Sequence, residues 1–100
     1  ITAPIAVTGT GTVAIDLSAT ESFNVTPSGN ITLNMSNPAS GCTYVFIMKP
    51  GTTPYTIAFT QTIKWKGGTV YAANTANATD IVTLYYDGTD YYGNFGEDYA

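Results

Sequence analysis

The chain contains no histidine and no arginine. It has three lysines and seven acidic residues, so the formal net charge is −4. Without histidine, neither a histidine-based catalytic triad nor a histidine metal site can be built. Without clusters of basic residues, the surface has few cations to replace the counterions of nucleic-acid phosphates or to meet an anionic membrane. We therefore expect neither nucleic acid nor membrane as a partner.

Cysteine and long apolar runs are scarce as well. Cys42 is the single cysteine, so no disulfide can form within the chain. Its place before an apolar run predicts a small buried hydrophobe at the start of a strand, and a reactive or intermolecular thiol is the less favoured alternative. No apolar run approaches the roughly 20 residues of a membrane-spanning helix. Because the chain begins at Ile1 and not at Met, we favour a piece of a longer protein over a processed product.

Threonine is the most frequent residue and tyrosine is abundant, both of which favour strands. Turn signals recur about every eight to twelve residues, and apolar residues alternate with polar ones in several segments. This pattern predicts one all-β domain over residues 1–100, an antiparallel, jelly-roll-like β-sandwich of about eight or nine short strands. The expected core consists of the apolar residues that share one face of these strands: Ile15, Leu17, Phe23, Val25, Ile31, Leu33, Tyr44, Phe46, Ile57, Phe59, Ile81 and Leu84.

Near the N-terminus, Gly9-Thr10-Gly11 with Ala14 matches the dinucleotide-binding pattern Gly-x-Gly-x-x-Ala after a strand. That motif works only if a helix follows, so that the helix N-terminus faces the pyrophosphate. Here the following residues alternate like a strand, and the chain is too short for a doubly wound sheet. We interpret the motif as a hairpin turn.

Near the C-terminus, two runs of β-branched and aromatic residues flank Asp87-Gly88-Thr89-Asp90, which predicts an antiparallel hairpin. Two carboxylate pairs, Asp87 with Asp90 and Glu97 with Asp98, raise the question of glycosidase chemistry, which needs two acids in a cleft. At a hairpin tip, acids more often serve the turn itself, and a weak calcium site there lacks enough oxygen ligands in sequence. We expect no enzyme, no catalytic residue, no metal and no cofactor.

The tyrosine pairs Tyr85-Tyr86 and Tyr91-Tyr92 place one ring on each side of their strands. One member of each pair is therefore expected in the core, and the other faces solvent or a partner. Trp65 lies between two lysines in a segment, Ile63-Lys64-Trp65-Lys66, that is typical of an edge strand. Core, subunit interface and ligand platform all remain open for Trp65.

The order of these segments resembles a β-sandwich domain found in bacteriophage fibre and virion-surface proteins. The similarity covers residues from about Asp16 to Asn94. It consists of Gly29-Asn30-Ile31-Thr32-Leu33, Asn37-Pro38, Gly41 with Thr43-Tyr44-Val45-Phe46-Ile47, Trp65 with Gly67-Gly68-Thr69, Ala76-Asn77-Ala78, and the closing hairpin from Asp80 to Gly93.

The resemblance implies a non-enzymatic virion structural domain, on a fibre or a capsid-surface appendage at the virion surface, used for assembly, display and adhesion to host glycans. It also implies homo-oligomerisation, with a trimer favoured, and contact with other virion proteins. Residues 1–15 are expected to form a connecting strand or one exchanged between subunits. Two alternatives stay open: a carbohydrate-binding module of a secreted bacterial protein, and a self-assembling extracellular filament subunit. Candidate interface or glycan-contact residues are Trp65, Tyr71, Tyr91 and Tyr99.

Overall fold

The computed structural model describes residues 4–72 and 76–99. These residues form a 7-stranded sheet and no α-helix, so the all-β class is confirmed, with fewer strands than expected. The elements are β1 (Ile5–Asp16), β2 (Ser22–Ser36), β3 (Cys42–Met48), β4 (Ile57–Phe59), β5 (Ile63–Trp65), the 3-10 turn η1 (Lys66–Gly68), β6 (Thr79–Tyr86) and β7 (Tyr91–Tyr99).

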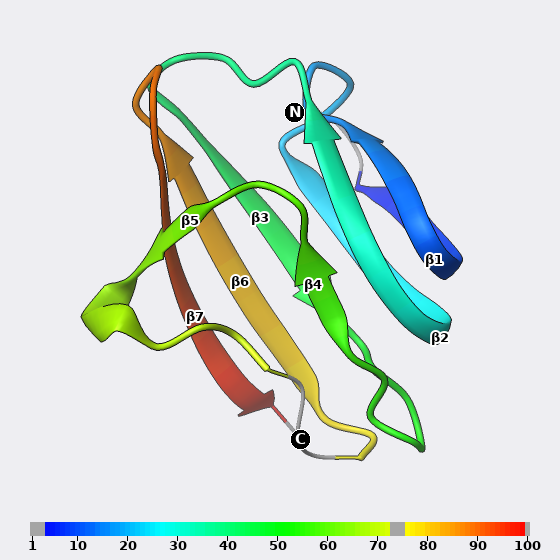
Figure 1. Cartoon of the computed structure of the whole chain (residues 1–100). Helices are drawn as coiled ribbons and strands as arrows, with labels where there is room; N and C mark the ends of the chain where they lie inside the picture. The colour runs from blue at the N-terminus through cyan, green and yellow to red at the C-terminus, as the bar shows by residue number, and fades with distance from the viewer. Residues whose placement is uncertain (1–3, 73–75, 100) are drawn as a thin grey trace.

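The N-terminal half consists of three U-shaped arches stacked in parallel (Figure 1). β1 is one complete arch, β2 is the second, and β3 with β4 makes the third. The two arms of an arch do not pair with each other; each arm pairs with the same arm of the next arch. In the first arms Val7 lies beside Val25, and Val25 beside Met48. In the second arms Val13 lies beside Leu33, and Leu33 beside Phe59.

The arms form two facing layers. The first arms continue into β6, β7 and β5, giving the strand order β1-β2-β3-β6-β7-β5. The second arm of β1 pairs with the second arm of β2, which pairs in turn with β4. Among the strands of the described residues, β3 with β6 and β6 with β7 pair antiparallel, and the other pairings are parallel. The expectation of an antiparallel arrangement is therefore wrong for the arches, and a jelly roll is not confirmed.

The turns of the arches explain why Gly9-Thr10-Gly11 matches the dinucleotide-binding pattern, and why its interpretation as a hairpin turn is wrong. Gly9 and Gly11 have positive φ angles of 106° and 72° and reverse the direction of β1 without pairing its arms. The Thr10 hydroxyl, at the turn of β1, donates to the backbone carbonyl of Asn30, at the turn of the next arch, at 3.0 Å. Its oxygen also lies 2.6 Å from where a Cβ on Gly29 would stand, so the close stacking of the two turns depends on that glycine.

The core fills the space between the two layers, and its members match the predicted set closely. Phe59 is half-buried at the end of its layer. Ile81 is a correction: it lies on the outer face of β6, because Val82 and Leu84 point inward and side chains alternate along a strand. The fully buried members share the inner faces of the arches and of β6: Phe23, Val25, Ile31, Leu33, Tyr44, Phe46, Met48, Val82 and Leu84.

Gln61 ends the three-strand layer. β4 stops at Phe59, and two residues later the Gln61 side chain takes the place of a strand beside β2. Its Nε2 donates to the Met35 carbonyl at 2.6 Å, and its Oε1 accepts from the Met35 N–H at 3.1 Å. A side-chain amide thus reproduces the donor and acceptor of a backbone amide, which satisfies β2 beyond the end of its neighbour.

The C-terminal hairpin is confirmed. β6 and β7 are antiparallel, and Tyr86 lies opposite Tyr91 across the turn. The Asp87 carboxylate accepts from the backbone N–H groups of Thr89 and Asp90 at 2.8 and 2.7 Å. These bonds lower the pKa of the Asp87 carboxyl. As expected from the sequence, this acid serves the turn.

Substitution of Gly93 by alanine should lower the free energy of unfolding by about 1–3 kcal/mol. An added Cβ would stand 2.6 Å from Cε3 of Trp65 and 2.8 Å from Cγ2 of Ile63, and both neighbours are packed. Gly96→Ala is the matched control, since its Cβ would meet the hydroxyl end of the exposed Tyr99, which can move away. Urea unfolding of the two variants measures the difference; equal losses would contradict this packing.

Candidate functional site

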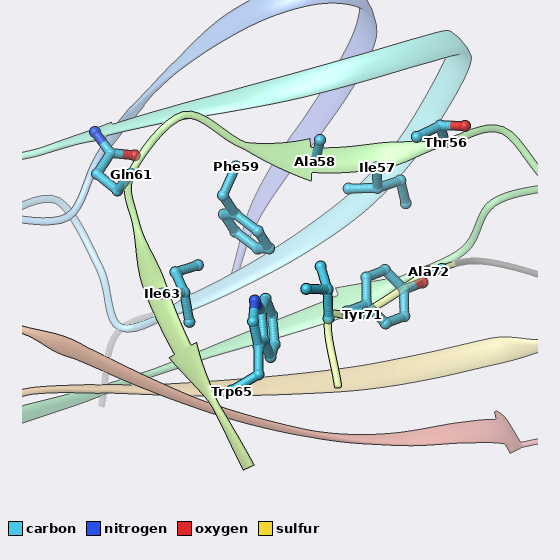
Figure 2. Close-up of a pocket in the computed structure, with 10 residues that line it drawn as sticks. Thr56, Ile57, Ala58, Phe59, Gln61, Ile63, Trp65, Tyr71 and Ala72 are labelled. Atoms are coloured by element: carbon cyan, nitrogen blue, oxygen red, sulfur yellow. The ribbon is translucent and has the colours of Figure 1, made fainter. Parts of the chain in front are cut away.

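A pocket of about 440 Å³ opens where the three-strand layer ends at β4. Within residues 4–72 and 76–99 that layer has no strand after β4, so part of the inner face of the wider layer has no strand opposite it. Figure 2 shows β4 along one side of the pocket, β5 at its end, and the chain around Tyr71 opposite. The lining is mostly apolar, with Thr56 and Gln61 as polar members among Ile57, Ala58, Phe59, Ile63, Trp65, Val70, Tyr71 and Ala72.

Three aromatic rings that line this pocket, those of Phe59, Trp65 and Tyr71, are held in place by contacts between rings. Trp65 lies 6.0 Å from Phe59 and 5.8 Å from Phe95, measured between ring centroids. Phe95 in turn meets Tyr71 at 5.4 Å with an interplanar angle of 73°. Such tilted and edge-to-face contacts are favourable for aromatic pairs. The pocket therefore has well-packed walls, and the half-buried Trp65 ring stands inside it (Figure 2).

Tyr71 connects the pocket to a buried acid. Its hydroxyl donates to Oδ2 of Asp80 at 2.7 Å, and both residues are almost fully buried. Burial, together with the Asp80 carboxylate and the nearby Glu97, raises the pKa of the Tyr71 phenol far above its usual value. A phenol that holds its proton so firmly donates a structural hydrogen bond and cannot serve as a base at neutral pH.

A second group of aromatic residues lies on the outer face of the larger layer. Thr43, Tyr85, Tyr92 and Lys64 stand directly beside one another across β3, β6, β7 and β5. Tyr85 and Tyr92 are each 43% exposed. The Lys64 ammonium lies 5.9 Å from the centre of the Tyr92 ring and 3.2 Å from Oδ2 of Asp90. We call the adjacent exposed rings of Tyr85 and Tyr92 the tyrosine platform.

The candidate residues taken from the sequence are divided among different places. Trp65 and Tyr71 both line the pocket, joined through Phe95. Tyr91 is buried against Tyr86, with ring centroids 4.7 Å apart. Tyr99 is 55% exposed and leans over Gly96 at the far end of β7. Within one chain, then, Tyr71 and Tyr91 present little surface to a partner or a glycan.

The tyrosine platform was only half visible in the sequence. Alternation correctly predicted one buried and one outward ring in each tyrosine pair, and Tyr86 and Tyr91 are the inward members. A four-residue turn between the two runs pairs Tyr86 with Tyr91, and therefore Tyr85 with Tyr92. Counting residues outward from the turn could have predicted the pair. The contribution of Lys64 could not be predicted, because it depends on the pairing of β5 with β7.

Within residues 4–72 and 76–99, no group of three carboxylate or thiol side chains is arranged so that it could hold a metal ion. In the same part of the chain, no helix has the length and apolar character needed to cross a membrane.

Comparison with known proteins finds no matching family model, no matching curated protein and no matching solved structure.

Alkaline pH should destabilise the fold through Tyr71. The free phenol ionises near its usual pKa of 10.0, whereas the folded one keeps its proton. Its contribution to stability is thus complete below about pH 10 and is lost as pH rises toward the higher folded pKa. Thermal melts between about pH 8 and 11 should show a shallower decline for Tyr71→Phe than for the wild type.

In the same experiment, Tyr71→Phe should cost about 1–3 kcal/mol at neutral pH, because Asp80 loses a buried donor. Tyr85→Phe, at an exposed ring, serves as the matched control and should follow the wild-type pH dependence. If Tyr71→Phe declined as steeply as the control, the buried phenol would not be the source of the alkaline sensitivity.

Proposed function

We propose that this chain is a non-enzymatic domain of the bacteriophage virion surface, on a fibre or capsid appendage, which serves in assembly and display and adheres to host glycans. The observation that carries the adhesive role is the tyrosine platform. The resemblance of the chain to fibre and virion-surface domains and its surface rich in threonine and asparagine support the location. In this proposal the domain resembles a β-sandwich in one respect: it has two facing layers around one core.

The tyrosine platform suits a saccharide for a simple chemical reason. A pyranose ring presents C–H groups on its faces and hydroxyls around its rim. Two adjacent rings on an open sheet offer an apolar strip for the C–H faces. Around the strip lie Lys64, Asp90 and the exposed Asn94, which supply donors and acceptors for hydroxyls. Lys64 neutralises Asp90, and the Asp87 carboxylate beside the Tyr92 hydroxyl adds one negative charge, so the surface favours a neutral sugar over an acidic one.

The same observation favours a second candidate, a carbohydrate-binding module of a secreted bacterial protein. The neighbouring genes distinguish the two candidates: capsid, portal and tail genes support the virion domain, and glycosidase genes support the module. A homo-oligomer, with a trimer favoured, belongs to the first proposal. The partly exposed Trp65 and the exposed Tyr99 are the members of the sequence-derived set with surface available for such contacts.

Tyr92→Ala should weaken glycan binding about tenfold or more, because removing a ring that covers ~100 Å² of sugar forfeits roughly 2 kcal/mol. Tyr92→Phe keeps the ring and should bind nearly as the wild type does. Tyr99→Ala removes an exposed tyrosine at the far end of β7, which this proposal assigns to subunit contacts and not to the glycan, and it is the matched control. A glycan array followed by calorimetric titration gives the measurement. Equal binding by Tyr92→Ala and the wild type would overturn the role of the tyrosine platform.

A further inference from the structure

The arch stack is open at β1. This strand pairs with β2 and has no other partner among the described residues, so it forms the edge of both layers. Between its arms a hollow of about 330 Å³ reaches the core and is lined by Val7, Val13, Ile15 and Phe23 among others. Ile5, at the rim, is 39% exposed. We call the two arms of β1 with this hollow the end face.

Backbone groups along the end face point outward in a definite pattern. At the end of the second arm, the Leu17 N–H donates to the Ser36 carbonyl of β2 and therefore points toward β2. By alternation, Thr12 and Ala14 direct their N–H and C=O groups away from β2. Beside the first arm, the Val25 carbonyl of β2 accepts from the Lys49 N–H on the side away from β1. By alternation, the N–H and C=O of Asn24 therefore point toward β1. Asn24 lies opposite Ala6, and in a parallel ladder its bonds go to the residues on either side of Ala6. Ala6 and Thr8 therefore also face the open edge.

The sequence of β1 is a palindrome centred on Thr10: Ile-Ala-Val-Thr-Gly-Thr-Gly-Thr-Val-Ala-Ile from Ile5 to Ile15. Each residue in the first arm has an identical counterpart at the same distance from the turn in the second arm. A rotation of 180° about an axis through the turn and parallel to the arms exchanges the positions of the arms. It matches each side chain with one of the same type, while the chain direction in each arm is reversed. In a two-fold dimer joined through this face, each residue of one arm would therefore lie opposite a residue of the same type in the other copy.

We propose that two copies of this chain join end face to end face across a two-fold axis, with the first arm of each β1 pairing antiparallel with the second arm of the other. In this register Ala6 lies opposite Ala14 of the second copy, and Thr8 opposite Thr12. These are the residues whose backbone groups face the open edge, so each pair can exchange two hydrogen bonds. The inward valines and isoleucines of the two arches then close each other's hollow.

The lack of charge on the end face favours a second copy as the occupant. The chain is acidic overall, yet residues 4–15 contain no charged side chain. Asp16, which also lines the hollow, is bonded to Ser18 and Asn37 and would lie opposite Pro4 of the second copy, so the pairing places no like charges opposite each other. Arms of five residues at ~3.3 Å each, in layers ~10 Å apart, give an end face of roughly 17 by 20 Å. Two such faces together amount to roughly 700 Å², less than a typical specific interface, so the backbone hydrogen bonds between the arms must supply the specificity.

This contact goes beyond the proposed surface function and does not use the tyrosine platform. It yields a dimer by itself; the favoured trimer would need a different interface. It agrees with the expectation that the N-terminal strand pairs between subunits. In the proposed dimer, however, β1 also remains paired with β2 of the same chain.

The test uses charge at the exposed positions Ala6 and Ala14, which oppose each other only across the interface. Ala6→Lys/Ala14→Lys places lysines opposite lysines, and the dimer should dissociate at least tenfold more readily, with recovery at high salt. Ala6→Lys/Ala14→Glu places lysine opposite glutamate in both pairs and should restore the dimer. Sedimentation equilibrium reads the mass, twice the 10.5 kDa of one chain for a dimer.

Circular dichroism on the same samples should show the same strand content in all three proteins, since both alanines are exposed in the single chain. A monomeric wild type at high micromolar concentration would overturn the proposal. So would a trimer, or equal association of the two charged variants. A monomer would also remove the homo-oligomer from the proposed function, and a trimer would support it. None of these outcomes bears on glycan binding, which the Tyr92→Ala titration tests separately.

Discussion

The register between stacked arches is the constraint on which the rest of the structure depends. Side chains alternate between the two faces of a strand, so a slip of one residue between arches would turn every core residue outward. In register, Phe23 lies beside Phe46, and their rings stack 5.1 Å apart at 16°. The register is held at both ends of the second arm of β2, by Thr10 bonded to Asn30 and by Gln61 bonded to Met35. Both contacts join residues far apart in sequence.

From that first stacked pair, an aromatic series runs through the core to the pocket. Phe46 meets Phe59 at 5.6 Å, Phe59 meets Trp65, and Trp65 meets Phe95. The series links the arches to the C-terminal hairpin across the gap that β4 leaves. The pocket thus follows from the strand order: three strands in one layer cannot cover the six strands of the other, and large rings fill only part of the difference. Gly93 makes this filling possible, because it lets Trp65 lie against the sheet.

Local patterns in the sequence predicted what local physics determines. Alternation identified the buried faces, and the Asp-Gly turn with β-branched flanks identified the hairpin between β6 and β7. Ile81 was misassigned because it was paired with Leu84 in the core, although residues three apart on a strand face opposite ways. The Gly9-Thr10-Gly11 turn suits an arch and a hairpin equally, since positive φ serves both. Only partners far away in sequence, such as β4 beside β2, decide between them, and alternation carries no information about partners.

The strand edges of the molecule are protected unequally, and this difference ties the fold to its use. β4 and β5 are three residues long; Gln61 follows the first, and Lys64 stands on the second. Short edges and lysines discourage pairing between molecules. β1 runs for twelve residues, and its first charged residue is Asp16, at its end. Two edges of the fold are therefore short and protected, whereas the longest edge is uncharged, palindromic and open onto the core. An edge of this kind is suited to contact with another molecule. The tyrosine platform lies on the face of the same larger layer, four strands away from the β1 edge at Tyr92, so contact along that edge leaves the platform open to solvent.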